Sequence, residues 1–376
     1  MENHCDRIFH GLYIQRDKDE SVKIAPCCVC GQSDPQSSPI DFVNDEYLNK
    51  LRQNTKNDLR NLECSACWKY ADNGMASKKD EKLTKVDDPT VILSLEYNTL
   101  PICNAKCITC GPKFSSLWVA DDLKLKKLKL KNPNSIFPDV SIGEIKNKGF
   151  NYDNLNLSQL EYLYFNGGEP LLTNDHIDVL SKIKNLENIT LSYSSNGSIY
   201  PSPETLEYWN KTKTTRIWFS IDAIGDQFNY IRFPLQWEEV KSNIIKLHNN
   251  FPNIDICFLF TAGVHNILEL KKTLDFFYDQ LIHSHLTDEK ADRYQFYIQL
   301  AVGVLDIKYT DKKLKQVFID ELKSIDEKYQ NKTNYIINYL ESTIEEPTVT
   351  WQTYLDQLDQ IRPTDWKKTL PRLIID

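Results

Sequence analysis

The sequence predicts an α/β fold in which a parallel sheet forms an open or partial barrel. A small cysteine-rich region precedes the barrel, and a mainly helical region follows it. From position 91 onward, short apolar runs rich in β-branched and aromatic residues alternate with helical patterns. This alternation is typical of parallel strands joined by right-handed helical crossovers. The ten cysteines supply the second observation, because eight of them fall in three tight groups.

Six apolar runs are predicted to be strands, and they are fewer than the eight of a closed (β/α) barrel. We therefore expect a partial (β/α)6 barrel. The runs are VILSLEY (91–97), LEYLYF (160–165), ITLSYS (189–194), RIWFSID (216–222), IDICFLF (254–260) and YQFYIQLAV (294–302). Helical spacing of apolar residues is found between and after them, at 177–184, 204–209, 237–248, 267–279 and 312–329.

These patterns divide the chain into three expected domains. Residues 1–88 form a cysteine-rich domain, in which a helix over 46–60 separates two cysteine groups. Residues 89–305 form the barrel, and residues 306–376 form a mainly helical region. Trp351, Tyr354, Leu358 and Trp366 are its expected anchors in the core.

Composition excludes several classes of protein. The chain has 376 residues and a net charge of −8, which disfavours nucleic acid as a partner. No run of eighteen apolar residues and no secretory signal are present, so we expect a cytoplasmic protein with no membrane partner. In such a protein, ten cysteines indicate metal or redox chemistry rather than disulfides.

The stretch ICNAKCITCGP carries Cys103, Cys107 and Cys110 directly after the first predicted barrel strand. The carboxyl ends of parallel strands are where such folds build their sites. Three thiolates can hold three irons of a cubane cluster and leave the fourth iron open, whereas structural zinc is closed by four protein ligands. No fourth cysteine or histidine lies within twenty residues, so the pattern indicates a reactive site.

This C-x3-C-x2-C pattern resembles the signature of the radical S-adenosylmethionine (SAM) superfamily. The resemblance implies a [4Fe–4S] cluster at Cys103, Cys107 and Cys110, whose open iron binds SAM. FNGGEP (165–170) is similar to the family's GGEP motif, whose backbone and glutamate receive the SAM amino group. Further residues resemble positions that contact SAM or substrate. The implied cofactor-binding residues are Gly167, Gly168, Glu169, Pro170, Ser194, Asn196, Ser220, Asp222 and Val264.

Structural alternatives remain open for three of these residues. Gly167 and Gly168 could form a turn that only ends a strand, and Asp222 could be a capping aspartate. The sequence departs from the family pattern at Thr109, where a bulky aromatic residue usually packs on the adenine.

The cysteines before the barrel form two C-x2-C pairs separated by 33 residues. Such pairs suit a zinc ribbon as well as a second iron–sulfur cluster. Their flanking residues resemble the twitch module, a shortened relative of the SPASM domain, which implies an auxiliary iron–sulfur cluster with zinc as the alternative. Five thiols are available for four places, and Cys5 is unassigned. The candidate metal ligands are Cys27, Cys28, Cys30, Cys64 and Cys67.

The resemblance implies a radical SAM enzyme that reductively cleaves SAM to a 5′-deoxyadenosyl radical and abstracts hydrogen from a substrate. We expect a peptide or protein substrate, an electron donor, and a separate partner for substrate recognition. The alternatives are a small-molecule substrate (a sugar, amino acid or nucleoside precursor) and a non-catalytic iron–sulfur or zinc scaffold.

Overall fold

The computed structural model describes residues 4–16, 22–34, 40–72, 77–130, 154–282, 293–341 and 349–375. The chain divides into two compact units. The first comprises Met1–Leu100, Gly143–Ser194 and Pro201–Arg216. The second comprises Pro101–Ile142, Ser195–Tyr200 and Ile217–Asp376.

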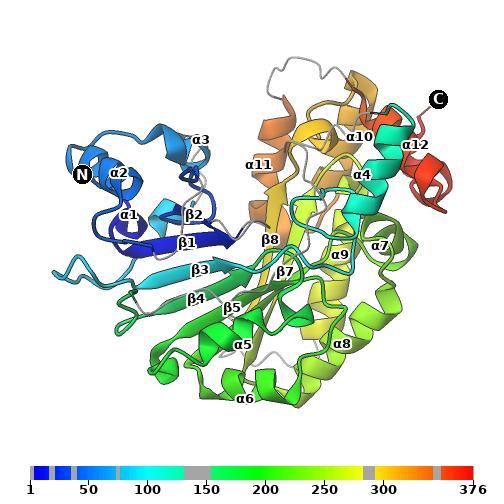
Figure 1. The fold of residues 1–376 in the computed structure, drawn as a ribbon. Coiled ribbons are helices and arrows are strands. Elements are labelled where there is room, and N and C mark those ends of the chain that lie inside the picture. The colour runs from blue at the N-terminus through cyan, green and yellow to red at the C-terminus, as the bar shows by residue number, and fades with distance from the viewer. Residues whose placement is uncertain are drawn as a thin grey trace. The chain divides into compact units, whose positions relative to one another are not determined.

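The first unit is built on a sheet whose strands run in the order β2-β1-β3-β4-β5 (Figure 1). All neighbours pair in parallel except β2, which is antiparallel to β1. Gly11 pairs with Ser94, Ser94 with Tyr162, and Tyr162 with Thr190, so four parallel strands start level and end at one edge. The strands are β1 (Gly11–Arg16), β2 (Val22–Ala25), β3 (Ser94–Asn98), β4 (Tyr162–Asn166) and β5 (Thr190–Ser195).

Two of these strands, β1 and β2, were not predicted, because the residues before position 89 were interpreted as a separate domain. Every residue of β1 is buried, including the polar Gln15 and Arg16. Arg16 donates to the Tyr97 hydroxyl at 3.3 Å, and Gln32 donates to Gln15 at 2.8 Å. Paired polar side chains at buried positions removed the alternation that would have indicated a strand. The domain boundaries at 88 and 305 stay predictions.

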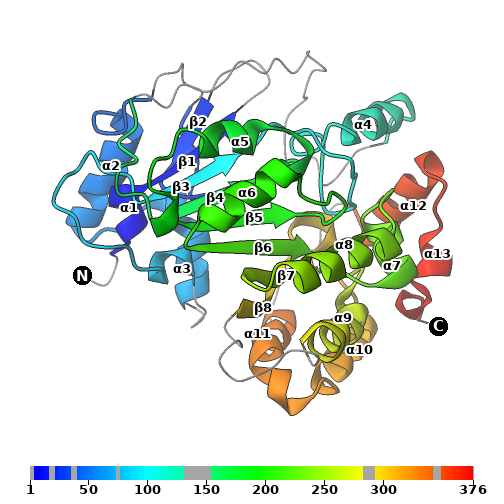
Figure 2. The same ribbon diagram turned by 90° about the horizontal axis from the view of Figure 1, so that it is seen from below.

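Helices cover this sheet, and α5 and α6 lie along β4 and β5 in Figure 2. Between them and the strands, Phe165, His176, Tyr193 and Trp209 form a buried group of rings, with centroids 5.0–6.1 Å apart. The helices of the first unit are α1 (Asp6–His10), α2 (Glu46–Lys56), α3 (Ser65–Asp72), α5 (Asp175–Leu180) and α6 (Pro203–Lys211), with short 3-10 turns at Leu62–Cys64, Lys78–Asp80, Pro170–Leu172 and Leu186–Asn188.

The second unit continues from β6 (Thr214–Ser220), which begins in the first unit, into β7 (Ile254–Ala262) and β8 (Tyr294–Leu300). Strands β7 and β8 pair in parallel over seven residues. Helix α11 (Gln330–Glu341) contacts β8 through a hydrogen bond from the Tyr335 hydroxyl to the Ile298 carbonyl, at 2.7 Å.

Helices make up most of the second unit. They are α4 (Trp118–Lys127), α7 (Gly225–Ile231), α8 (Trp237–Asn250), α9 (Leu270–Asp275), the π-helical turn Phe276–Ile282, α10 (Lys312–Lys323), α11 (Gln330–Glu341), α12 (Trp351–Ile361) and α13 (Trp366–Thr369), with 3-10 turns at Ile267–Glu269, Gly303–Leu305, Glu327–Tyr329 and Pro371–Leu373.

The mixed α/β fold with a parallel sheet is confirmed. Each of the six predicted runs overlaps an observed strand, β3 to β8, and the region after β8 is helical. The four predicted anchors of that region, Trp351, Tyr354, Leu358 and Trp366, are all buried. Among the described residues, no helix has the length and apolar character needed to cross a membrane.

Candidate functional site

The loop that carries Cys103, Cys107 and Cys110 lies in the second unit and is held through its backbone. Lys106 and Ile108 donate their N–H groups to the carbonyls of Phe233 and Ile231, at 2.8 and 2.9 Å. Side chains satisfy the loop's own carbonyls. Ser115 donates to Ala105, Trp118 to Cys107 and Tyr354 to Ile108. The loop lacks regular structure, yet these bonds fix its path.

Polar groups surround the loop's sulfur atoms. Arg232 Nη1 donates to Cys107 Sγ at 3.7 Å, and Asn196 Nδ2 donates to Cys103 Sγ at 3.9 Å. The Ala105 N–H also donates to Cys103 Sγ, at 3.4 Å. Donors of this kind stabilise thiolates and tune the reduction potential of an iron–sulfur cluster.

Burial raises the pKa of the Cys110 thiol to about 12, and charge on Cys107 and Cys103 adds to this rise. Burial also raises the pKa of Cys107, while the Arg232 guanidinium opposes the rise. As thiolates, Cys107 and Cys110 would therefore repel each other, and the positive charge of Arg232 would attract both. A metal centre would remove the repulsion, because metal binding requires and stabilises deprotonated thiols.

Arg232 is itself held by Asp222, which is fully buried. The two side chains form an ion pair of 2.6 Å between Arg232 Nη2 and Asp222 Oδ2. Asp222 Oδ1 accepts the N–H of Thr261 on β7 at 2.8 Å. Burial lowers the pKa of Arg232, but Asp222 and Cys107 more than offset this and raise it. Asp222 thus orients the guanidinium that contacts Cys107.

The carboxyl-terminal helices support the same loop through a second buried ion group. Asp121 on α4 is fully buried and binds Lys106 of the loop at 2.8 Å and Arg362 at 2.7 Å. The Arg362 guanidinium also lies 4.6 Å from the centre of the Trp118 ring. Residues more than 240 positions apart in the sequence therefore stabilise one side of the cysteine loop.

The turn after β5 contacts the other side of the loop. Asn196 Nδ2 donates to Asn104 Oδ1 at 3.0 Å, and Asn104 Nδ2 donates to Ser198 Oγ at 2.8 Å. Gly197 has a φ of +75°, and a Cβ there would lie 2.9 Å from Val240. Only glycine lets the turn lie this close to α8, because a side chain would clash in a conformation that L-residues disfavour.

The GGEP turn lies in the first unit, directly after β4. Gly167 has a φ of +122°, and a Cβ would lie 2.4 Å from Asn98 Oδ1 and 2.7 Å from the Thr99 carbonyl. Glu169 is buried, precedes the 3-10 turn that begins at Pro170, and accepts the Leu171 N–H at 3.2 Å. Glycine at position 167 therefore lets the backbone of the turn lie close to Asn98 and Thr99, at the end of the neighbouring strand β3.

The remaining predicted residues lie at strand ends. Ser194, in the first unit, shares a hydrogen bond of 2.5 Å with the Tyr164 hydroxyl. Ser220, the last residue of β6, is partly exposed. Val264 is fully buried in the second unit, and its N–H donates to Leu305 at 2.9 Å. The structure thus brings Cys103 and Asn196 together, and links Asp222 to Cys107 through Arg232.

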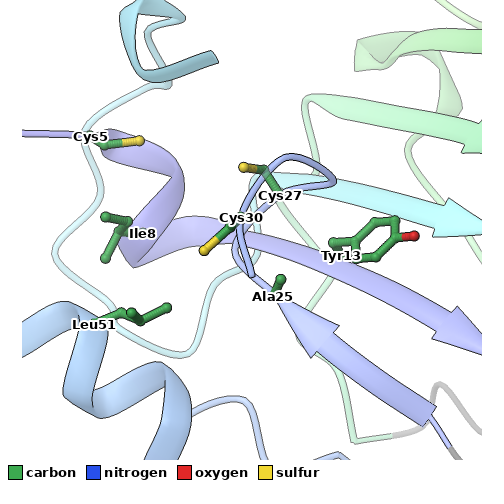
Figure 3. Packing of buried hydrophobic residues seen from close by; sticks show 7 residues of the cluster. All are labelled: Cys5, Ile8, Tyr13, Ala25, Cys27, Cys30 and Leu51. Atoms are coloured by element: carbon green, nitrogen blue, oxygen red, sulfur yellow. The ribbon is translucent and has the colours of Figure 1, made fainter. Parts of the chain in front are cut away.

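The amino-terminal cysteines gather in the first unit. Cys27 and Cys30 are buried in one apolar cluster (Figure 3). Cys64 packs against this cluster. Cys30 Sγ lies 3.7 Å from Cys64 Sγ. Their hydrogen bond, and then burial, raise the pKa of Cys64. Cys67 is buried on α3.

Cys28 differs from these thiols. Its N–H donates to Glu96 Oε2 at 2.9 Å, and burial together with the Glu96 charge raises the pKa of its thiol. Glu96 is buried between Arg7 Nη1 at 2.9 Å and Lys78 Nζ at 3.1 Å.

Within the described ranges, no three His, Cys, Asp or Glu side chains are close enough together to hold a single metal ion. An iron–sulfur cubane needs a wider arrangement, because its irons and sulfides lie between the ligand sulfurs. The loop provides three thiols, a guanidinium and an amide donor, which fit a cluster with one open iron.

Four supporting residues, Asp121, Arg232, Tyr354 and Arg362, contribute more to the loop than the sequence indicated. Tyr354 was expected to be an anchor in the core, but not a support of the loop. An arginine between apolar residues, as in NYIRFP, is a weak local signal of a buried ion pair. For Tyr354 and Arg362, no local pattern could have indicated contact with a loop so distant in sequence.

The parallel strands and the helices define a protein of the α/β class, and its three-thiol loop follows β3 and fits an iron–sulfur cluster. The family model for the Radical SAM superfamily matches residues 97–277, which cover the loop, the GGEP turn and β3 to β7. This stretch therefore resembles the domain of iron–sulfur, SAM-dependent enzymes. No curated protein matches the chain in sequence.

Solved structures that are similar to the chain include three with bound AdoMet. The chain is similar to hexahistidine-tagged anSMEcpe with bound AdoMet (16% identity, 67% of this chain, 61% of that chain, TM-score 0.40). It is also similar to native anSMEcpe with bound AdoMet and Kp18Cys peptide (15%, 67% and 63%, TM-score 0.38). A third is SuiB of Streptococcus suis bound to S-adenosylmethionine (12%, 86% and 68%, TM-score 0.34). The match spans about three fifths of the anSMEcpe chain.

Proposed function

We propose that this protein cleaves SAM reductively at a [4Fe–4S] cluster held by Cys103, Cys107 and Cys110 and abstracts hydrogen from a peptide or protein substrate. The loop around Cys107 is the observation that supports the proposal, since a guanidinium and an amide contact its sulfur atoms. When bound, the cluster supplies the electron that converts SAM to a 5′-deoxyadenosyl radical.

The chain's own residues bind, orient and exclude water in this proposal. The three thiolates hold the cluster, and Arg232 favours its reduced form because a nearby positive charge stabilises added negative charge. The GGEP turn offers acceptors for an ammonium group, since Gly167 removes the side chain that would block close approach. Asn196 positions the cysteine loop, because its side chain donates a hydrogen bond to Asn104.

The amino-terminal cysteines form a second metal centre in this proposal, an auxiliary iron–sulfur cluster with zinc as the alternative. Its support is the convergence of two C-x2-C pairs, with Cys30 and Cys64 in sulfur contact at 3.7 Å. An auxiliary cluster accepts or relays the electron of a later redox step. Zinc in this place would be structural.

A peptide substrate is proposed from the twitch resemblance of the amino-terminal region. The likeness to anSMEcpe and SuiB is too low to carry an argument about substrate. Peptide and small-molecule substrates can be separated directly. Cell extract is split by ultrafiltration, and each fraction is added to the reduced enzyme with SAM. Stimulated release of 5′-deoxyadenosine by the larger fraction, lost after protease treatment, would support a peptide.

The core of the proposal is tested on protein reconstituted without oxygen, by measuring iron, sulfide and the 5′-deoxyadenosine formed with dithionite and SAM. We expect Cys107→Ala to lose the loop's iron and all product. Cys257→Ala is the matched control, because Cys257 is buried on β7 in the same unit, outside the loop. If Cys107→Ala still made product, the assignment of the SAM cluster to this loop would be wrong. If a fully loaded wild type bound no SAM, a scaffold role would replace this proposal.

A further inference from the structure

Cys5 lies beside the two amino-terminal C-x2-C pairs. It stands at the start of α1, is only 8% exposed, and belongs to the apolar cluster that contains Cys27 and Cys30. In Figure 3 the sulfur atoms of Cys5 and Cys27 point toward one another, and Cys30 directs its sulfur into the space beside them. Three thiols from two segments of the chain therefore face one region.

The second C-x2-C pair joins the same group. Cys64 packs against the cluster and lies 3.7 Å from Cys30, sulfur to sulfur. The charges of Cys64 and Cys67 both act on the Cys5 thiol, so Cys5 is close to this pair as well. Gly31 donates its N–H to the Glu63 carbonyl at 2.7 Å, which ties the two cysteine-bearing loops together. Cys5 thus stands between the two pairs.

Cys28 packs against the cluster that contains Cys27, and the charges of Glu96 and Lys78 act on both thiols. The two thiols differ in their other neighbours. The charge of Cys5 acts on Cys27, whereas Cys28 acts on the hydroxyls of Tyr13 and Tyr164. The N–H of Cys28 donates to Glu96 on β3. Cys27 is thus the member of this pair whose sulfur faces Cys5 (Figure 3).

We propose that Cys5 is a ligand of the amino-terminal metal centre, together with thiols of the pairs Cys27/Cys30 and Cys64/Cys67, and that Cys28 is not a ligand. This inference rests on the proposed function, because it requires that the amino-terminal cysteines hold a thiophilic metal. A buried thiol facing other thiols is explained by a shared metal, which neutralises their charges and links the segments. Cys28 is left as a thiol beside Glu96 and Lys78.

The test measures metal content rather than activity. Cys103, Cys107 and Cys110 are first replaced by alanine, so that any iron, sulfide or zinc bound after anaerobic reconstitution belongs to the amino-terminal centre. On this background, Cys5→Ser is compared with Cys64→Ser and Cys28→Ser. We expect Cys5→Ser and Cys64→Ser to lower metal affinity at least tenfold, whereas Cys28→Ser keeps full occupancy. Sulfide with iron indicates a cluster, and zinc alone indicates a structural site.

Alkylation of the unmutated protein provides a second readout that does not depend on a variant folding. Iodoacetamide labelling is followed by mass spectrometry before and after chelation. We expect Cys5 and Cys64 to become reactive together when metal is removed, while the labelling of Cys28 stays the same.

The outcomes separate the two proposals. If the background variant binds no metal, the auxiliary centre itself is wrong. If it binds metal and Cys5→Ser retains it as well as Cys28→Ser does, the centre stands and the role of Cys5 is overturned. Loss of metal from Cys28→Ser would likewise overturn the exclusion of Cys28.

Discussion

The two cysteine regions of this protein are held in different ways. The loop at Cys103–Cys110 is fixed by hydrogen bonds to its backbone from Ser115, Trp118 and Tyr354, and Arg232 contacts one of its sulfur atoms. The amino-terminal thiols instead pack in or against an apolar cluster, and burial and neighbouring groups raise the pKa values of Cys5 and Cys64. Under the proposed function, the protein fixes the first region before its cluster binds, whereas the second region depends on a metal for its structure.

Removal of metal should expose this difference most strongly. After chelation, we expect amide protection at 26–34 and 61–72 to fall by about a hundredfold or more, because a structural metal contributes folding free energy directly. Protection at 103–116 should fall much less, since its hydrogen bonds do not involve the cluster. Hydrogen exchange with mass spectrometry measures both. Equal loss in the two segments would contradict the comparison.

The charged group beside the amino-terminal thiols provides the next test. Glu96 is 1% exposed and binds both Arg7 and Lys78. Glu96→Ala removes the buried partner of Arg7, which is buried, and of Lys78, which is partly exposed, and leaves both with the exposed Glu81. This should cost about 3–5 kcal/mol of unfolding free energy. Glu207→Ala, which breaks an exposed pair with Lys211 in the same unit, should leave the denaturation midpoint unchanged. A similar midpoint for both variants would show that the Glu96 group is dispensable.

The same carboxylate predicts a dependence of stability on pH. Burial alone would raise the pKa of Glu96, but Lys78 and Arg7 hold it below its ordinary value. Its contribution is therefore complete above the unfolded pKa of about 4.3 and is lost as pH falls through the lower folded pKa. Thermal unfolding from neutral to acidic pH should show a shallower decline in Glu96→Gln than in wild type. An equally steep decline would assign acid sensitivity to other groups.

Local signals in the sequence were enough for the barrel strands and the three-thiol loop. Strands β3 to β8 overlap runs rich in β-branched and aromatic residues, and a C-x3-C-x2-C pattern can be recognised from the sequence alone. Strand β1 was missed because Gln15 and Arg16 are buried by pairing with residues elsewhere. The supports of the loop were missed for a related reason, since Tyr354 and Arg362 reach it only through tertiary packing.

Arg232 tests whether the loop's electrostatics are prepared by the protein. Arg232→Met removes the cation at Cys107, so we expect a lower reduction potential and SAM cleavage slowed about 10–100-fold. The double variant Arg232→Met/Asp222→Asn should show the same potential with better folding, because Asp222 no longer carries an unpaired charge. Arg293→Met is the control, as it breaks a pair with Asp255 in the same unit. Potentiometric titration that gave one potential for all three variants would exclude a tuning role.

The smallest expected effect concerns one backbone hydrogen bond of the loop. Tyr354→Phe removes the donor to the Ile108 carbonyl, and Tyr335→Phe removes an equivalent bond, also 2.7 Å long, to Ile298 on β8. Each should cost about 1–3 kcal/mol, because a carbonyl loses a hydrogen bond inside the protein. Only Tyr354→Phe should also release the loop's iron faster to a chelator, since its bond fixes the backbone next to Cys107. If both variants released iron at the wild-type rate, this contact would stabilise the fold without holding the cluster loop in place.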